Sequence, residues 1–259
     1  MNHKYCTVES DGEILIVTIN RPEVLNSLDV PSSIELSEVF DAFEQDDQHR
    51  VAIVTGAGEK AFCAGLDLKS QSGSTGLPQW PMSGFAGLTE RYGGTKPIIA
   101  AVNGIAAGGG FELALACDLV VAAEGARFSL PEARIGLAAL AGGIHRLSRQ
   151  IPLKHAMGML LTGRSVPAAE GVQLGFVNEV ASADELMATA RRWAERIAGC
   201  APLAILATKE VAIEGMRHGT VKDAMNMRYP AVERMVNSED FIEGPKAFVE
   251  KRKPVWKGK

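Results

Sequence analysis

The stretch A-G-G-G-F-E-L-A-L-A-C-D (residues 107–118) decides how the rest of the chain is interpreted. Its three consecutive glycines allow the backbone to approach a ligand closely, and the helix-forming residues after them place Gly109 at a helix start. A helix N-terminus has N–H groups without intrahelical partners and a partial positive charge. Glu112 follows in the first turn. The stretch predicts either half of an oxyanion hole beside a carboxyl group, or a packed helix start whose dipole Glu112 complements.

The composition limits the class of protein. The chain has 259 residues and a net charge of −4, and apart from its C-terminal end no basic run stands out, which argues against a nucleic-acid partner. The four cysteines lie far apart without a C-x-x-C pair, so neither zinc nor disulfides are expected. No segment approaches ~18 consecutive apolar residues, and no signal core is present. We expect a soluble, cytoplasmic protein without a membrane partner.

The first half of the chain alternates strand and helix patterns. Asp29 and Pro31 mark a helix start, and apolar residues recur at helical spacing after it. Short apolar, β-branched runs predict buried strands at 13–19, 51–55, 98–102 and 119–123. This order is typical of α/β proteins.

Beyond Pro152 the chain becomes mostly helical. Ser182 and Glu185 fit a capping box for a helix that ends near Ala198. Further helices are predicted at 202–216, 220–236 and 238–252.

A loose dinucleotide fingerprint, G-x-G-x-x-A, occurs at residues 56–61. No amphipathic helix begins at Gly58, and no acidic residue ends a second strand ~20 residues later, so a nicotinamide cofactor is not expected. The tighter feature is the turn A-G-L-D (64–67). Its small residues allow the Leu66 N–H to face a ligand while Asp67 caps the segment after the turn.

Two further segments have a functional and a structural interpretation. Residues 70–94 are either a loop and short helix that cover a pocket or a surface excursion with a few buried anchors. Pro131 and Glu132 are expected at the first and second positions of a helix, where a carboxylate complements the dipole. Gly142 and Gly143 then precede a basic helix, and its residues His145 and Arg146 are expected to face solvent or a subunit contact. A lone histidine predicts no metal site.

Eight motifs occur in one order along the chain: L-N-S-L-D (25–29), A-F-C-A-G-L-D-L (61–68), K-P-I-I-A-A-V-N-G (96–104), A-G-G-G-F-E-L-A (107–114), L-P-E (130–132), L-T-G-R (161–164), G-F-V-N-E-V (175–180) and A-F-V-E-K-R (247–252). Together they resemble the enoyl-CoA hydratase (crotonase) family over essentially the whole chain. The resemblance implies an α/β fold, a crotonase-type spiral of repeated ββα units over residues 1–198. It also implies a C-terminal α-helical trimerisation region over 199–259 and a homotrimer or a hexamer built as a dimer of trimers.

The resemblance also implies a catalytic site. In the family, the N–H groups matching Leu66 and Gly109 hold the thioester oxygen of an acyl-CoA, and the two catalytic glutamates match Glu112 and Glu132. These lie 20 positions apart, the interval that the hydratases keep. The expected reaction is reversible addition of water across the 2,3 double bond of an enoyl-CoA, with Glu112 as the water base and Glu132 as the proton donor. An isomerase remains the alternative, because the same oxyanion hole stabilises every enolate.

Coenzyme A, carried by the substrate, is the only cofactor implied, and no metal is expected. The Ala64 carbonyl is expected to contact the adenine. Lys60, Lys69 and Lys251 are expected near the phosphates, the last of them from a neighbouring subunit. Alternatively, these lysines are ordinary surface residues. The residues predicted to bind substrate or CoA are Lys60, Ala64, Gly65, Asp67, Leu68, Lys69, Gly108, Pro131 and Lys251.

The segment F-A-G-L-T-E (85–90) and the ending 238–259 look especially like the crotonobetainyl-CoA (carnitinyl-CoA) hydratase branch. A trimethylammonium substrate favours an aromatic or acidic wall, for which the candidates are Trp80, Phe85, Glu90 and Tyr92. The turn L-A-A-L-A (137–141) departs from the Pro-containing turn common in hydratases, which leaves the shape of the acyl group open.

Two other classes of protein fit the residues less well. A family member can bind RNA through a lysine-rich helix, but the matching residues 33–47 are acidic. A catalytically silent acyl-CoA-binding relative would be expected to lose Glu112 or Glu132, and both are present.

Overall fold

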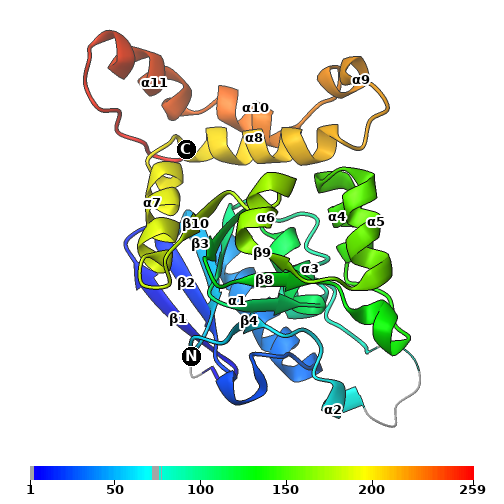
Figure 1. The fold of residues 1–259 in the computed structure, drawn as a ribbon. Coiled ribbons are helices and arrows are strands. Elements are labelled where there is room, and N and C mark those ends of the chain that lie inside the picture. The colour runs from blue at the N-terminus through cyan, green and yellow to red at the C-terminus, as the bar shows by residue number, and fades with distance from the viewer. Residues whose placement is uncertain (1–2, 72–75, 77) are drawn as a thin grey trace.

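The computed structural model describes residues 3–71, 76 and 78–259. In these ranges the strands form a six-stranded sheet of order β1-β2-β3-β5-β7-β10 and a four-stranded sheet of order β4-β6-β8-β9 (Figure 1). The first sheet consists of β1 (Cys6–Asp11), β2 (Ile14–Ile19), β3 (Val51–Gly56), β5 (Ile98–Val102), β7 (Leu119–Ala123) and β10 (Glu179–Ala181). The second consists of β4 (Ala61–Cys63), β6 (Ile105–Ala107), β8 (Arg127–Ser129) and β9 (Val166–Pro167).

Successive turns of the chain supply one strand to each sheet. The pairs β3 and β4, β5 and β6, and β7 and β8 follow one another along the chain, and within each sheet their members are parallel neighbours. Parallel strands need long crossovers, which here run through the other sheet and a helix. The predicted spiral of ββα units is therefore confirmed. The N-terminal strand β1, antiparallel to β2, was not predicted from the sequence.

The helices of the core lie against these sheets. α1 (Val30–Gln45) begins as predicted, since the side chain of Asp29 accepts the Ser32 N–H in a capping box, and it buries Leu36, Phe40 and Phe43. The remaining core elements are η1 (Pro22–Val24), α2 (Leu68–Gln71), η2 (Phe85–Gly87), α3 (Gly109–Ala116), η3 (Glu132–Ile135), α4 (Gly143–Gln150), α5 (Leu153–Thr162), α6 (Ala168–Leu174) and α7 (Leu186–Ala198).

The predicted capping box of α7 is wrong. The helix begins at Leu186, and the side chain of its N-cap residue Glu185 makes no capping hydrogen bond. The Glu185 N–H instead donates to the Ser182 carbonyl, so the segment that was expected to be the first turn is a separate tight turn.

The C-terminal helices form a layer that crosses one end of the core in Figure 1. This layer contains α8 (Pro202–Gly215), α9 (Val221–Met225), α10 (Pro230–Val236) and α11 (Glu239–Val249). The predicted helix at 220–236 is thus two helices, α9 and α10, because Pro230 occupies the first turn of α10 and begins a new helix there. Lys209 of α8 fastens the layer to the core, since its ammonium pairs with Asp118 at 2.8 Å and donates to the Lys96 carbonyl.

Helix α3 is pressed against the second sheet. The Phe111 ring packs against those of Phe128 and Phe176 with centroids 5.2 and 5.1 Å apart. A Cβ atom on Gly110 would lie 1.8 Å from the Cys63 carbonyl oxygen, so only glycine permits this approach of α3 to β4. The helix N-terminus is therefore fixed next to the turn that follows β4.

We predict that Gly110→Ala destabilises the protein by about 3 kcal/mol or more, because a methyl group cannot enter this backbone contact. The matched control is Gly158→Ala in α5, where a Cβ atom would meet nothing within 4 Å. The control is expected to be neutral or stabilising by about 0.5–1 kcal/mol. Urea unfolding of both variants checks this, and equal effects would contradict the packing argument.

Candidate active site

A cavity of about 360 Å³ opens at the N-terminus of α3. One wall comes from the turn after β4, another from η3 and the residues that follow it, and a third from the segment before η2. Its lining residues are Ala64, Leu66, Leu68, Gly76, Pro78, Trp80, Phe85, Gly108, Gly109, Glu112, Pro131, Glu132, Ile135, Leu137, Ala138, Leu140 and Ala141. Segments far apart in the sequence therefore meet around one mostly apolar space.

Two backbone N–H groups at this cavity lack protein acceptors. The Leu28 N–H donates to the Gly65 carbonyl and the Asp67 N–H donates to the Leu28 carbonyl, both at 2.8 Å, which leaves the Leu66 N–H between them unpaired. Gly109 is the first residue of α3, so its N–H has no intrahelical acceptor. Across the described residues, no hydrogen bond joins either N–H to an acceptor.

Gly65 brings these two N–H groups close together. It has a positive φ of 93°, and a Cβ atom on it would lie 2.7 Å from the Ala107 carbonyl oxygen and 3.0 Å from the Gly109 nitrogen. The turn therefore touches the start of α3 directly. The ring of Phe85 lies against Gly109, where a Cβ atom would be 2.8 Å from the ring, and fixes that residue from another direction.

Glu112 is a buried carboxyl group on the first turn of α3, with 3% of its surface exposed. Its Oε1 accepts the Gly143 N–H at 2.8 Å. Burial raises the pKa of Glu112 from 4.5 to about 7, since an ionised carboxylate loses its hydration there. The Gly143 hydrogen bond opposes this rise of the pKa, and the charge of Glu132 adds to it.

Glu132 faces the same cavity from η3. Pro131 is the N-cap residue and Glu132 the first residue of a 3₁₀ helix, which therefore begins one residue later than predicted. The carboxyl group lies against Gly108, where a Cβ atom would be 3.0 Å from Oε1. Its Oε2 is buried and has no hydrogen-bond partner among the described residues, and burial raises the pKa of this group as well. The structure therefore brings together the two carboxyl groups and the two N–H groups that the sequence singled out.

The other predicted contacts divide into two groups. Ala64, Leu68, Gly108 and Pro131 line the cavity, whereas Gly65 and Asp67 shape the turn beside it. The Asp67 carboxylate pairs with Arg21 at 3.3 Å and accepts the Lys69 N–H at 3.2 Å.

None of the three predicted lysines is among the described residues that line the cavity of this chain, and Lys69 is exposed on α2. Lys60 is exposed just before β4. Lys251 is exposed after α11, in the layer far from α2 in Figure 1.

The segment 70–94 partly confirms its functional interpretation. Gly76, Pro78, Trp80 and Phe85 line the cavity, while residues 72–75 and 77 lie outside the described residues. Of the four candidates for a cation-binding wall, Trp80 and Phe85 lie at the cavity, in edge-to-face contact with centroids 5.2 Å apart. Glu90 and Tyr92 are exposed and are not lining residues.

The expectation that Arg146 faces solvent or another subunit is wrong. Its guanidinium is half-buried and donates to the Thr89 carbonyl at 2.7 Å. The sequence did not predict this hydrogen bond, because a basic residue on a short helix does not indicate which buried carbonyl will accept from it. The available signal for a buried side chain here was the pair Gly142 and Gly143, because other side chains pack closely against both glycines.

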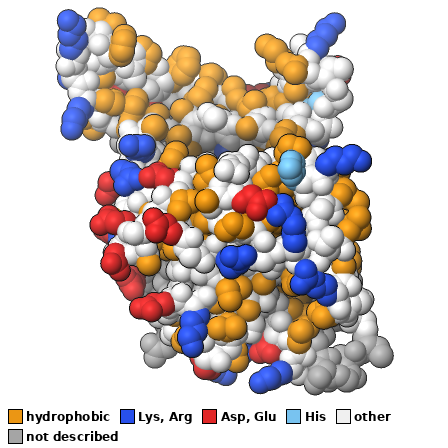
Figure 2. Space-filling model, in the orientation of Figure 1, with side chains coloured by type: hydrophobic (Ala, Val, Ile, Leu, Met, Phe, Trp, Pro, Cys, Tyr) orange, Lys and Arg blue, Asp and Glu red, His pale blue; other side chains and the backbone are white. Residues whose placement is uncertain are grey.

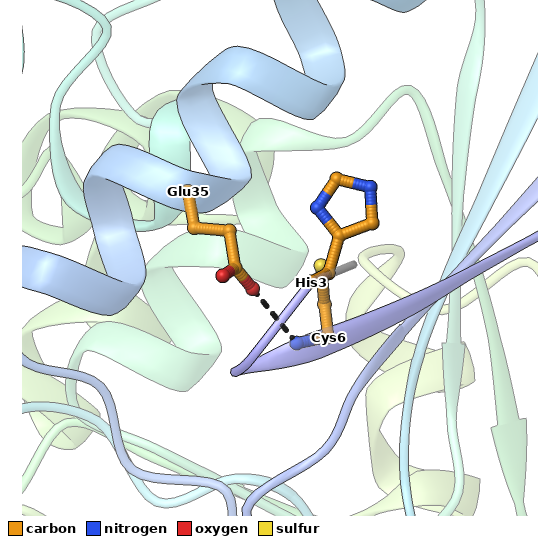
Figure 3. A group of neighbouring side chains, drawn as sticks. All are labelled: His3, Cys6 and Glu35. Carbon is orange, nitrogen blue, oxygen red and sulfur yellow. Dashed lines mark hydrogen bonds between the residues drawn. The ribbon is translucent and has the colours of Figure 1, made fainter. Parts of the chain in front are cut away.

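One group of possible metal ligands lies away from the cavity. His3, Cys6 and Glu35 place a ligand atom each within 4.8 Å of one another (Figure 3). Both Glu35 oxygens already accept backbone N–H groups, those of Lys4, Tyr5 and Cys6 at 2.7–3.0 Å. These bonds fasten the N-terminal segment to α1, so the group is explained as a structural contact.

Solved structures share this fold. An enoyl-CoA hydratase from Mycobacterium tuberculosis H37Rv superimposes with a TM-score of 0.91 at 39% identity and covers 98% of this chain and 99% of its own. A carnitinyl-CoA hydratase from Mycobacterium avium superimposes with a TM-score of 0.78 at 39% identity over the full length of both chains. The fold and cavity therefore define an enzyme of the crotonase class.

Sequence comparison narrows the class to one family. Residues 9–259 match the Enoyl-CoA hydratase/isomerase family. A carnitinyl-CoA dehydratase from Escherichia coli K12 is 47% identical over 96% of this chain and 97% of its own length. The chain belongs to the enoyl-CoA hydratase/isomerase family, which confirms the predicted hydro-lyase of the enoyl-CoA hydratase type.

No helix in the described parts of the chain combines the length and the apolar character needed to cross a bilayer.

We predict that Glu112→Gln stabilises the protein at pH 8 but not at pH 4.5. The folded state raises the pKa of Glu112 from 4.5 to about 7, so it binds this proton more tightly than the unfolded chain, and the wild type loses stability as pH rises through that window. Replacing the carboxyl group should recover up to about 3 kcal/mol above pH 7. Urea unfolding at the two pH values measures this, with Glu124→Gln, an exposed site, as control. A pH-independent effect would contradict the assignment.

Proposed function

We propose that this cavity hydrates the 2,3 double bond of an enoyl-CoA thioester with Glu112 and Glu132 as the catalytic residues. The observation that carries the proposal is that one cavity contains two desolvated carboxyl groups and two N–H groups without protein acceptors. The thioester oxygen gains negative charge when water adds to the β-carbon. Two fixed donors at that oxygen lower the barrier, each by about 3 kcal/mol. In this proposal the donors are the Leu66 and Gly109 N–H groups.

The surroundings of the two carboxyl groups support different roles. Glu112 accepts the Gly143 N–H, which favours the ionised form and holds the carboxylate in one orientation, as a base that activates water requires. Glu132 has an oxygen with no partner, which is free to carry the proton that is delivered to the α-carbon. Shifting a double bond can be done with one such group, so the pair favours water addition over isomerisation.

We further propose that the CoA moiety lies along the turn after β4. Ala64 lines the cavity, which supports a contact of its carbonyl with the adenine, and Asp67 holds the turn through Arg21. Lys60 and Lys69 then approach the phosphates from this chain, and Lys251 approaches them from a neighbouring subunit. No other cofactor and no metal takes part.

For the acyl group we propose a trimethylammonium-bearing chain of the crotonobetainyl or carnitinyl type. Relatives named carnitinyl-CoA dehydratase and carnitinyl-CoA hydratase support it. The cavity supports it too, because Trp80 is among its lining residues and an aromatic ring attracts a quaternary ammonium group. The wall formed by Leu137, Ala138, Leu140 and Ala141 is apolar and suits the methyl groups of such a cation.

Assembly through residues 199–259 is the remaining part of the proposal, with residues 1–198 as the acyl-CoA-binding core of a cytoplasmic enzyme. Hydrophobic side chains gather on the C-terminal layer (Figure 2). Apolar surface of this extent marks an interface, so we propose a homotrimer or a dimer of trimers. The exposed apolar residues are Ile213, Met216, Val221, Met225, Met227, Val236, Phe241, Ile242, Phe248, Val249 and Val255.

Replacing either carboxyl group should slow hydration strongly. We expect the wild type to consume crotonobetainyl-CoA, followed by loss of the conjugated-thioester absorbance and by mass spectrometry of the hydrated product. Glu112→Gln and Glu132→Gln should each lower kcat about 100-fold or more. Glu124→Gln, an exposed control, should keep wild-type activity. Full activity in either site variant, or a product of unchanged mass, would overturn water addition by this pair.

The same assay tests the proposed acyl group when crotonobetainyl-CoA is compared with crotonyl-CoA, which lacks the ammonium head group. A preference for crotonobetainyl-CoA in kcat/KM is expected, and equal values for the two thioesters would sink the proposed specificity while leaving the hydratase intact.

Light scattering should give a molar mass three or six times that of the 27.6 kDa chain. Phe248→Glu introduces a charge at a side chain that is 85% exposed in the single chain and should lower this mass at micromolar concentrations. Lys246→Glu on the same helix is the control. A wild-type mass of one chain would contradict the proposed assembly.

A further inference from the structure

Arg146 lies on α4, one turn after the glycine pair that begins this helix. Its Nη2 donates to the Thr89 carbonyl at 2.7 Å and its Nη1 to the Ala141 carbonyl at 3.5 Å. The backbone N–H of Arg146 donates to the Gly142 carbonyl at 2.8 Å. One side chain therefore ties the cavity wall at Ala141 to the segment that follows η2.

The two glycines leave room for two different side chains. A Cβ atom on Gly142 would lie 2.0 Å from Nη1 of Arg146, whereas one on Gly143 would lie 2.9 Å from Oε1 of Glu112. The guanidinium and the carboxyl group thus pack against adjacent peptide units. Because the Gly143 N–H donates to Glu112, any shift of this backbone changes the orientation of the carboxylate.

The charge of Arg146 is not neutralised by a close partner. In the part of the chain that the structure describes, no carboxylate oxygen lies within 4.0 Å of its guanidinium, and its acceptors are backbone carbonyls. The carboxyl groups whose charges act on it are those of Glu112 and Glu90, and the Tyr92 hydroxyl and the Cys117 thiol are further titratable groups near it. A guanidinium stays protonated even when half-buried, so its positive charge persists beside the cavity.

We propose that Arg146 is a positioning residue for Glu112: it holds the backbone of residues 141–143 against the Thr89 carbonyl, which fixes the Gly143 N–H that orients the Glu112 carboxylate, and its positive charge favours the ionised form of that group. The proposal rests on the role of Glu112 as the water base. The charged groups that face Glu112 are Glu132 from η3 and Arg146 from α4; the former raises the pKa of Glu112 and the latter lowers it. The N–H groups of Ala141 and Gly143 act in the same direction as Arg146.

Two substitutions separate the charge from the hydrogen bonds. Arg146→Gln removes the charge and keeps an amide donor, whereas Arg146→Lys keeps the charge but cannot bridge two carbonyls with a planar fork. Arg149→Met on the same helix is the matched control, since Arg149 is exposed and, among the described residues, its guanidinium bonds only to the His145 carbonyl.

The pH profile of kcat/KM is the readout that a merely structural role would not move, because its rising limb reports ionisation of the base in the free enzyme. We expect Arg146→Gln to move this limb to higher pH and to lower kcat at neutral pH by about 10–100-fold, with a small change in KM. Arg146→Lys should lower kcat while the limb stays at its wild-type position. A limb that stays in place in Arg146→Gln, or moves equally in both variants, would overturn the proposal.

An infrared titration of the Glu112 carboxyl band without substrate keeps this test separate from the proposed function. The band is assigned by its loss in Glu112→Gln. A wild type that hydrates no enoyl-CoA would defeat the proposed function, yet the titration would still report whether Arg146→Gln raises the pKa of Glu112. If Arg146→Gln does not fold, as judged by circular dichroism, Arg146→Lys is the deciding variant. A Glu112 titration that is displaced from that of the wild type contradicts the proposal, and an unchanged titration supports it.

Discussion

The contact between the backbone of α3 and the turn after β4 is the constraint on which the rest of the structure depends. Gly110 lies against the Cys63 carbonyl, and Gly65 lies against Ala107 and Gly109. Side chains at these points would push the two segments apart, and the two unpaired N–H groups could no longer meet one oxygen atom. The four-stranded sheet supplies this contact, because its strands β4 and β6 are parallel, hydrogen-bonded neighbours that deliver both segments to the same end of the sheet.

Desolvation then sets the chemistry of the cavity. Apolar walls raise the pKa of both carboxyl groups, that of Glu112 to about 7, so each group keeps its proton to higher pH than it would in water. The N-terminus of α4 moderates this effect at Glu112 through Gly143, and Glu132 has no corresponding bond to its free oxygen. Neighbouring carboxyl groups thereby acquire different surroundings, which is how one site can contain an acid and a base.

Local patterns were sufficient for much of this fold. The apolar runs of β2, β3, β5 and β7 and the capped start of α1 follow from residue type and spacing, since each is buried along one element. The spiral itself and both glutamates came from the family resemblance, because sequence spacing alone cannot bring Glu112 and Glu132 to one cavity. Long-range contacts escaped prediction. Arg146 turns inward to a carbonyl 57 positions away, and the pattern at Ser182 and Glu185 fits a helix cap that the surrounding turn does not form.

The central claim is that the Leu66 and Gly109 N–H groups bind the thioester oxygen, and isotope-edited infrared spectroscopy tests it most directly. Crotonobetainyl-CoA labelled with ¹³C at the thioester carbonyl would be bound to the Glu112→Gln, Glu132→Gln double variant, which is expected not to consume it. Two hydrogen bonds to the oxygen weaken the C=O bond, so the account predicts a carbonyl band at lower frequency than for the same thioester in water. A bound carbonyl band at or above the frequency in water would contradict it.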